Sequence, residues 1–265
     1  MTREVAAVIF EVSNKDPKPE FVAALNHVGD YGTILIADEV VTGFRLGQQG
    51  ACGVYGIKPD LACYGKALGS GVPVAALCGK RELMREFDLA YTTSPVFMSF
   101  THAGNVGGLT AAKQTLEEIQ KRSQEIYFQL WCTGKKLMTS FQDAARSAFV
   151  ACEAVGQPAR SHFKFHPTGS LTVEALRAVF IQWMQQRGVL MGVPNFPTLA
   201  HSNEDIENTW LAMRAALGAV RAAVDADSVE GILEGPVPIT LYSVRAERSI
   251  ENRERAGYHG SLGRF

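Results

Sequence analysis

Short apolar runs alternate with amphipathic segments along the first half of the chain. Residues 5–10 (VAAVIF) form a continuous run rich in β-branched side chains, which predicts a strand buried on both faces. From Pro19 the apolar positions repeat with helical spacing, and a glycine-bounded stretch at 29–32 ends that helix. Residues 33–37 (TILIA) are the next apolar run. A strand, a helix and a strand in this order predict a βαβ unit with parallel strands and a right-handed crossover.

Two of the predicted strands end at polar residues that could carry chemistry. The run at 33–37 leads into Asp38, and a shorter run at 59–64 leads into Gly65 and Lys66. The carboxyl ends of parallel strands face the ligand crevice of an open α/β sheet. We therefore expect Asp38 and Lys66 to face the same crevice.

The second half of the chain has the pattern of a smaller α+β unit. A strictly alternating run at 162–166 (HFKFH) predicts a half-exposed strand with Phe163 and Phe165 inward. A long helix is predicted from residue 107, with a break at Thr133-Gly134. The other predicted elements are an irregular stretch at 42–58, strands at 74–79 and 148–155, and helices at 81–87, 135–145, 172–187 and 203–224, the last two with Thr172 and Asn203 as N-caps.

Composition places the chain among ordinary globular proteins. Hydrophobic residues make up 46% and charged residues 20%, and 26 Lys+Arg against 27 Asp+Glu leave a net charge of -1. This balance gives no electrostatic case for nucleic acid or an anionic membrane as a partner. Five cysteines without a CxxC pair suit free thiols in a reducing compartment. No apolar run approaches the roughly 20 residues of a membrane span and the N-terminal run is too short for a signal peptide, so we expect a cytoplasmic protein.

Two common site motifs are excluded by their spacing. A P-loop needs a glycine five residues before the Gly-Lys pair and a serine or threonine after it, and these positions hold Asp60 and Ala67. His162 and His166 lie on an alternating strand, without the helix and the intervening glutamate of a zinc protease pair. We therefore expect no metal site.

Lys66 and Asp38 each allow a plain interpretation and a chemical one. Taken alone, Lys66 could be a surface charge and Asp38 an ordinary cap at a strand end. A lysine desolvated by its neighbours can instead form Schiff bases with carbonyl compounds. Paired with an aspartate, such a lysine suggests pyridoxal phosphate, because the aspartate would keep the ring nitrogen protonated and the ring could then act as an electron sink.

Three motifs in order carry a resemblance to a known family. They are TILIADEVVTGFR at 33–45, PDLACYGKALGSGVPVAALCGKREL at 59–83 and FTHAGNVGGLTAA at 100–112. Together they resemble the class III aminotransferases, a branch of the fold-type I pyridoxal phosphate enzymes, and within that family they look most like its aminomutases. The resemblance covers roughly residues 5–224.

The resemblance implies roles for four residues. Lys66 would form the internal aldimine with pyridoxal 5'-phosphate and then shuttle the proton between the substrate carbon and the cofactor carbon. Asp38 would bind the pyridinium nitrogen, and Val40 would pack against the ring face. Thr101 would reach the cofactor phosphate of the other subunit in a homodimer with shared active sites.

The chain also departs from the family pattern. In the family, a Gly-Ser/Thr loop that cradles the cofactor phosphate and an aromatic residue that stacks on the ring both precede the first strand seen here. Nothing before Val5 supplies them, so the sequence reads as the C-terminal part of such an enzyme. Asn105 and Arg45 fall on family positions too, and we interpret both as structural, with Arg45 in an ion pair.

The expected fold is α/β, a fold-type I pyridoxal phosphate-dependent transferase. A partial cofactor-binding large domain with a mainly parallel sheet would span residues 1–131, a small C-terminal α+β domain 132–225, and an appended tail 226–265. The expected function is a class III aminotransferase or aminomutase that moves an amino group on an amino acid or semialdehyde through Lys66. A non-catalytic remnant or partner subunit of such an enzyme is the alternative, and decarboxylation or racemisation on the same cofactor stays open.

Overall fold

The computed structural model describes residues 5–12, 16–97, 103–192 and 194–238, and the chain divides into two compact units. The first unit comprises Met1–Thr139, Ala154–Phe163 and Gly192–Ile206. The second comprises Ser140–Glu153, Lys164–Met191 and Glu207–Phe265. The functional domains expected at 1–131, 132–225 and 226–265 stay a prediction.

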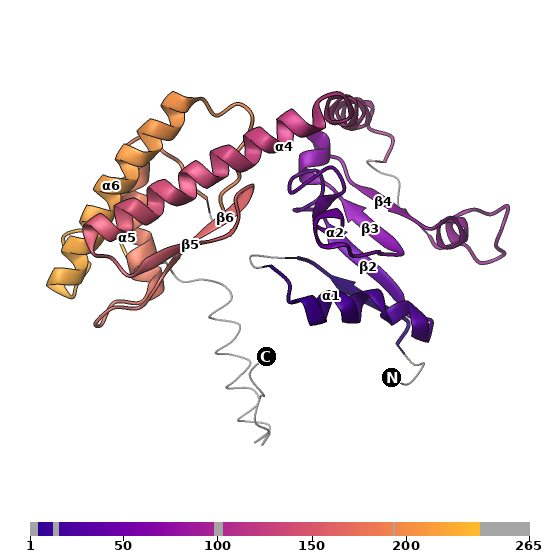
Figure 1. Cartoon of the computed structure of the whole chain (residues 1–265), viewed down its shortest axis with the longest axis horizontal. Helices are drawn as coiled ribbons and strands as arrows, with labels where there is room; N and C mark the ends of the chain where they lie inside the picture. The colour runs from indigo at the N-terminus through magenta and orange to yellow at the C-terminus, as the bar shows by residue number, and fades with distance from the viewer. Residues whose placement is uncertain (1–4, 13–15, 98–102, 193, 239–265) are drawn as a thin grey trace, which may run out of the picture. The chain divides into compact units, whose positions relative to one another are not determined.

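A four-stranded sheet organises the first unit (Figure 1). Its strands lie in chain order: β1 (Ala7–Phe10), β2 (Ile34–Glu39), β3 (Leu61–Tyr64) and β4 (Ala76–Gly79). The first three strands are parallel and β4 is antiparallel to β3, which confirms a mainly parallel sheet. Between β1 and β2 the chain forms α1 (Pro19–Asn26) and the 3-10 helix η1 (Val28–Tyr31), as the predicted βαβ unit requires.

The prediction that the first strand is buried on both faces is wrong. Residues of β1 alternate between exposed and half-buried, and Ile9 is 66% exposed. In β2 the alternation is between half-buried and fully buried positions. Among the described residues β1 pairs only with β2, so it is an edge strand. The apolar character of its side chains does not reveal this edge position.

Helix α2 (Gly50–Tyr55) lies in the stretch that was expected to be irregular. The carboxylate of Glu39, at the end of β2, accepts hydrogen bonds from the first free amides of this helix, Ala51 N at 3.0 Å and Cys52 N at 2.7 Å. It therefore takes the place of a local N-cap, which explains why the sequence around the helix carries no start signal. The remaining short helices of this region are η2 (Lys66–Gly69), α3 (Arg81–Met84) and η3 (Arg85–Phe87), and the last two confirm the helix predicted at 81–87.

The core of the first unit joins the sheet to α1 and α2. Leu35 and Ala37 of β2 are 2% and 1% exposed, and they belong to one cluster with Leu25 of α1 and with Ala51 and Cys52 of α2. Burial of these side chains favours folding of the unit, because each fully buried leucine contributes about 1.5–3 kcal/mol and each smaller side chain contributes less. The cluster fixes β2 rigidly and with it the end of the strand that carries Asp38.

Helix α4 (Val106–Ala148) is the longest element, and its course corrects the predicted break at Thr133-Gly134. The helix continues through Gly134, where an added Cβ would lie 1.8 Å from the carbonyl oxygen of Pro158. This glycine therefore serves close packing and does not end a helix. The backbone departs from helical geometry at Arg122 instead (φ -129°, ψ 27°). Neither α4 nor any other described helix is long and apolar enough to cross a membrane.

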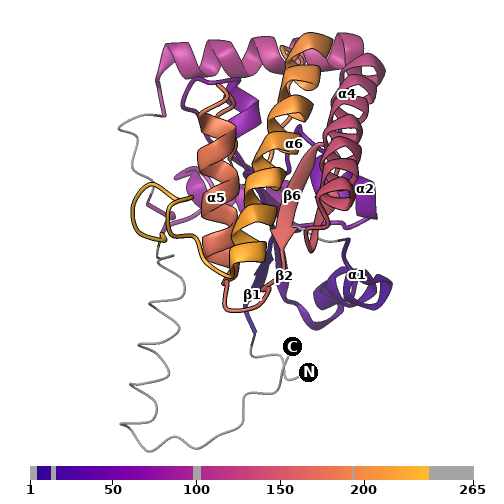
Figure 2. The ribbon, with the colours of Figure 1, turned by 90° about the vertical axis from the view of Figure 1, so that its left-hand side faces the viewer.

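Strands β5 (Cys152–Gln157) and β6 (Arg160–Phe165) pair with each other, and Phe163 and Phe165 are buried as the alternation predicts. In the second unit, helices α5 (Val173–Gln185) and α6 (Asn203–Ala226) lie side by side (Figure 2). The ring of Phe141 packs edge-on against Phe165 and Phe180, at centroid distances of 6.0 and 5.7 Å. These aromatic contacts join α4, β6 and α5 into the core of the second unit.

The caps of the last two helices are partly as predicted. Thr172 caps α5 by accepting a hydrogen bond from Ala175 N at 3.2 Å. At α6 the predicted cap, Asn203, is one residue too late. Ser202 Oγ accepts from Asp205 N at 3.1 Å, and the Asp205 carboxylate accepts from Ser202 N at 2.8 Å, which is a reciprocal capping arrangement.

Candidate active site

Asp38 and Lys66 lie at the same edge of the sheet, and the expectation that both face one crevice stays a prediction. Asp38 is in β2 and pairs in register with Cys63 of β3, and β3 ends at Tyr64, two residues before Lys66. Because β2 and β3 are parallel, their carboxyl ends lie at the same edge of the sheet. Asp38 is half-buried, and its Oδ1 accepts a hydrogen bond from Val40 N at 3.0 Å.

The charge of Asp38 reaches the neighbouring strand. Burial raises the pKa of the Cys63 thiol, and the Asp38 carboxylate raises it further. A thiol whose pKa is raised carries less thiolate at neutral pH and is a weaker nucleophile. Cys63 is therefore a half-buried, poorly nucleophilic thiol beside the aspartate.

Lys66 is exposed, which corrects the expectation that its neighbours desolvate it. It is the first residue of η2, and its backbone is in the left-handed region with φ +42°. This conformation costs a residue other than glycine about 1–2 kcal/mol. Strain of this kind is concentrated at functional sites, where the surrounding fold holds a residue in place. Lys66 is thus an exposed residue on a strained turn.

Val40 packs against the turn that carries the lysine. An added Cβ at Gly65 would lie 3.4 Å from Cγ1 of Val40, so the valine side chain already fills the space next to Gly65. This places Val40 between the ends of β2 and β3. Its packing against a cofactor ring stays a prediction.

Two residues of the motif at 100–112 have different predicted roles, one at the cofactor phosphate and one in the fold. Thr101, expected to reach a phosphate, lies outside the described residues. Asn105 is structural as predicted, because its Oδ1 accepts a hydrogen bond from Gly108 N at 3.0 Å and so caps α4.

Glu39, which the sequence pattern does not single out, is the best-anchored acid of this region. Its side chain is 1% exposed, and it accepts hydrogen bonds from Ala51 N, from Cys52 N and from the hydroxyl of Thr42 at 2.5 Å. Strand alternation could have identified it, since Leu35, Ala37 and Glu39 share the buried face and Asp38 is on the other. Glu39 ties the loop after β2 to α2 and thereby fixes the backbone of Asp38.

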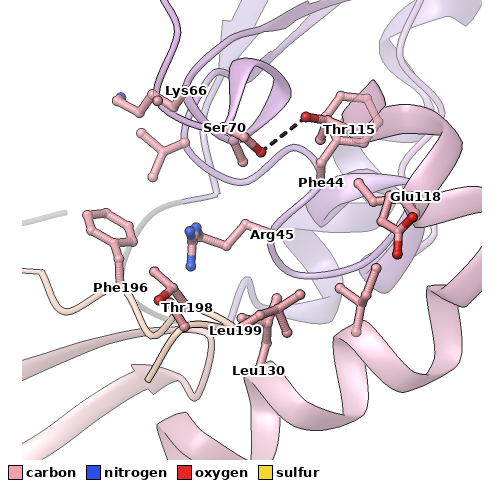
Figure 3. Close-up of a pocket in the computed structure, with 16 residues that line it drawn as sticks. Phe44, Arg45, Lys66, Ser70, Thr115, Glu118, Leu130, Phe196, Thr198 and Leu199 are labelled. Atoms are coloured by element: carbon pink, nitrogen blue, oxygen red, sulfur yellow. Dashed lines mark hydrogen bonds between the residues drawn. The ribbon is translucent and has the colours of Figure 1, made fainter. Parts of the chain in front are cut away.

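A pocket of about 740 Å³ opens beside Lys66 (Figure 3). Its walls come from the loop after β2, from η2, from α4 and from residues 196–200, all in the first unit. Phe44, Ile126 and Leu130 provide apolar surface, and Lys66 and Arg45 provide the cationic groups. The hydroxyl of Thr115 donates to Ser70 Oγ at 3.1 Å across one wall. Asp38 does not belong to this lining.

Arg45 is held by backbone and an aromatic ring, which corrects the predicted ion pair. Its Nη1 donates to the carbonyl oxygens of Ala159 at 3.2 Å and Pro197 at 3.0 Å, and its guanidinium lies 5.1 Å from the centroid of the Phe196 ring. No described carboxylate forms an ion pair with it. Burial lowers the pKa of the Arg45 guanidinium, and nearby Tyr127 partly offsets this effect.

The donor set at the strand ends fits a particular class of ligand. An accessible amine on one strand end and a carboxylate on the next suit a molecule with an aldehyde and a basic ring nitrogen, because the amine can attack the aldehyde while the carboxylate accepts from the protonated ring nitrogen. No group of three or more His, Cys, Asp or Glu side chains among the described residues could hold a metal ion.

Comparison with known proteins identifies relatives of the whole matched region. A family model described as class III aminotransferase matches residues 1–208. The glutamate-1-semialdehyde 2,1-aminomutase of Deinococcus radiodurans is 35% identical over 237 residues, which are 82% of this chain and 52% of that protein. The enzyme of the same name from Thermus thermophilus is 34% identical over 230 residues, 81% of this chain and 53% of that protein. The chain thus spans about half the length of these curated relatives.

Solved structures show the same fold. An omega-transaminase from Sphaerobacter thermophilus superimposes with a TM-score of 0.72 at 24% identity, over 82% of this chain and 53% of that one. A structure titled as a transaminase with PLP bound gives a TM-score of 0.77 at 21% identity, over 84% of this chain and 54% of that one. At these identities the likeness concerns the fold.

Proposed function

Because this chain belongs to the class III aminotransferase family, we propose that it contributes the lysine and the aspartate of a pyridoxal phosphate site that moves an amino group. The observation that carries the proposal is the placement of Asp38 and Lys66 on neighbouring parallel strand ends, with Lys66 exposed on a strained turn. The names of the matched proteins support the same chemistry, since one group is named as aminomutases and the other as transaminases.

Each residue has a distinct task in this proposal. When bound, pyridoxal phosphate supplies an aldehyde and an electron-withdrawing ring. The amine of Lys66 holds the aldehyde carbon and, once free, moves a proton at the reacting substrate carbon. Asp38 accepts a hydrogen bond from the ring nitrogen and keeps it protonated. Val40, already packed against Gly65, limits the movement of the ring.

The wider assignments follow from the family. We propose that the substrate is an amino acid or semialdehyde, that the protein acts in the cytoplasm, and that Thr101 serves the phosphate of a second subunit in a homodimer. Transfer of the amino group between two molecules and its movement within one molecule use the same lysine and aspartate. The two reactions differ in whether the amino-group donor leaves the pocket before the acceptor binds.

A non-catalytic partner subunit is the second candidate, and the span of the match favours it. The matched region spans about half the length of these curated relatives, and a complete cofactor site can be assembled from two polypeptides. Such a subunit would bind the cofactor only together with a second polypeptide. Direct titration of the purified chain therefore separates the two candidates.

The test is a spectroscopic titration of the purified chain with pyridoxal phosphate. We expect an absorbance band of the bound cofactor that saturates at one equivalent per chain and is lost in Lys66→Ala. Lys113→Ala is the matched control, because Lys113 is 72% exposed on α4 and does not line the pocket. Asp38→Asn should keep the band but shift its pH dependence, since the ring nitrogen loses its anionic partner. A chain that gives no band would support the partner subunit and contradict independent cofactor binding.

A further inference from the structure

The turn η2, which carries Lys66, is held by packing at its beginning and in its middle. Gly65, just before the turn, packs against Val40, and Leu68 in the middle of the turn is 4% exposed. Ser70, which directly follows the turn, is exposed. Its side chain therefore cannot be held by burial, and the end of the turn needs another kind of anchor.

Ser70 has the same strained backbone conformation as Lys66. Their φ angles are +44° and +42°, and both lie in the left-handed region. This region is unfavourable for every residue except glycine, because the Cβ atom comes too close to a carbonyl oxygen. Such a conformation persists only where the surrounding structure holds it. A serine at position 70 is therefore explained by a contact that a glycine could not make.

The hydroxyl of Ser70 makes such a contact with helix α4. Thr115 Oγ1 donates to Ser70 Oγ at 3.1 Å, and Figure 3 shows this hydrogen bond in the wall of the pocket beside Lys66. The same helix meets the chain again three residues after Ser70, because an added Cβ at Gly108 would lie 2.8 Å from the carbonyl oxygen of Pro73. Helix α4 thus supports the segment that follows the lysine turn at two points.

Water competes for the bond between Thr115 and Ser70 while the pocket is open. Both residues line the pocket, and a hydrogen bond that exchanges with water contributes only modestly to stability. A ligand that fills the pocket excludes this water and strengthens the bond, because the surroundings become less polar. The anchor is therefore strongest when the pocket is occupied, and the position of the Lys66 amine matters in that state.

We propose that Thr115 and Ser70 are positioning residues for Lys66, because their hydrogen bond fastens the end of the lysine turn to α4. The inference rests on the proposed function, since it concerns the lysine that holds the cofactor aldehyde. Both residues act through the backbone between Lys66 and Ser70. A lysine held in this way loses less conformational freedom on binding, so the bound state is favoured.

Amide hydrogen exchange in the cofactor-free chain tests the anchor. The amides of Leu68, Ser70 and Val72 each donate to a carbonyl oxygen of the segment 65–69, at 2.9, 3.2 and 2.9 Å. These amides should exchange about 2- to 10-fold faster in Thr115→Val, which keeps the shape of the side chain but cannot donate, and Thr115→Ser should restore slow exchange. Thr110→Val, a change at an exposed threonine of α4 outside the pocket lining, is the matched control. Exchange in Thr115→Val that equals exchange in this control would overturn the proposal.

Ser70→Gly is the second variant, and it separates positioning from overall stability. Glycine removes the hydroxyl together with the left-handed strain, so the urea midpoint should not fall although the turn exchanges faster. In the titration with pyridoxal phosphate, Ser70→Gly and Thr115→Val should bind about 2- to 10-fold more weakly, and Thr115→Ser should bind like the unsubstituted chain. Undiminished binding in both weakened variants would contradict the positioning role. If the unsubstituted chain gives no cofactor band, the proposed function fails, whereas the exchange comparison still decides whether the anchor exists.

Discussion

Gly50 leaves the space that the carboxylate of Glu39 occupies. A Cβ added to Gly50 would lie 2.3 Å from Oε2 of Glu39, and Gly50 itself has φ +63°. The first turn of α2 can therefore approach the end of β2 closely enough for its amides to bind the buried acid. This contact fixes the loop that follows Asp38.

Substitution of Gly50 should be far more harmful than that of a glycine with the same backbone. Gly56 has φ +66° with nothing within 4 Å of an added Cβ, so Gly56→Ala carries only the left-handed strain, about 1–2 kcal/mol. Gly50→Ala adds a collision with Glu39, and we expect it to lower the free energy of unfolding by about 1–3 kcal/mol more. Urea unfolding of both variants measures the difference. Equal losses would show that Glu39 does not occupy this space.

Glu39→Gln should destabilise the first unit although it preserves the shape of the side chain. An amide offers one acceptor oxygen where the carboxylate serves three donors, so at least one buried donor loses its partner, at about 1–3 kcal/mol. Glu117→Gln on α4, whose side chain is 41% exposed, is the matched control and should leave the urea midpoint nearly unchanged. A Glu39→Gln midpoint equal to that of the control would contradict this role.

The comparison of Asp38 and Glu39 shows what the sequence could reveal. The apolar run at 33–37 predicted the strand and the polar position at its end, because hydrophobic patterning determines burial. The helix at 50–55 could not be predicted in this way, because the side chain that caps its start, that of Glu39, comes from strand β2. The predicted ion pair of Arg45 was wrong for the same reason, because its true partners are distant in the sequence. The carbonyl groups that it binds lie 114 and 152 residues further along the chain.

Two helical glycines should respond to alanine with opposite signs. Gly134 in α4 faces the Pro158 carbonyl at 1.8 Å from an added Cβ, and backbone cannot move aside as a side chain can. We expect Gly134→Ala to destabilise the protein by about 3 kcal/mol or more. Gly218 in α6 has nothing within 4 Å, so Gly218→Ala should stabilise by about 0.5–1 kcal/mol.

Thermal unfolding followed by circular dichroism distinguishes the two substitutions. The midpoint should fall for Gly134→Ala and rise for Gly218→Ala. A rise for both would mean that Gly134 is an ordinary helix position, and the predicted break at Thr133-Gly134 would then regain support.

Asp60 should make the stability of the first unit depend on pH in the acid range. Burial alone would raise its pKa, but the hydrogen bond from Leu35 N at 2.7 Å and the ion pair with Lys80 at 2.5 Å outweigh this effect and lower it. A lowered folded-state pKa means that the stabilisation is complete above the unfolded-state pKa, about 3.9, and is lost as the pH falls through the folded-state value.

The corresponding variant is Asp60→Asn. At pH 7 we expect it to cost about 1 kcal/mol relative to the unsubstituted chain. The difference should shrink as the pH is lowered below about 3.9, because the carboxylate of the unsubstituted chain is then neutralised. Urea unfolding across this range provides the measurement, and a difference that grows toward low pH would show that the sign is wrong.

Lys66 is the residue to which, on the proposed function, the cofactor attaches. The most direct measurement is borohydride reduction of the chain after incubation with one equivalent of pyridoxal phosphate, followed by peptide mass spectrometry. We expect the added mass to lie on the peptide containing Lys66 and to be missing from Lys66→Ala, whereas Lys113→Ala should be labelled like the unsubstituted chain. A label spread over exposed lysines, with Lys66 modified no more than Lys113, would contradict it.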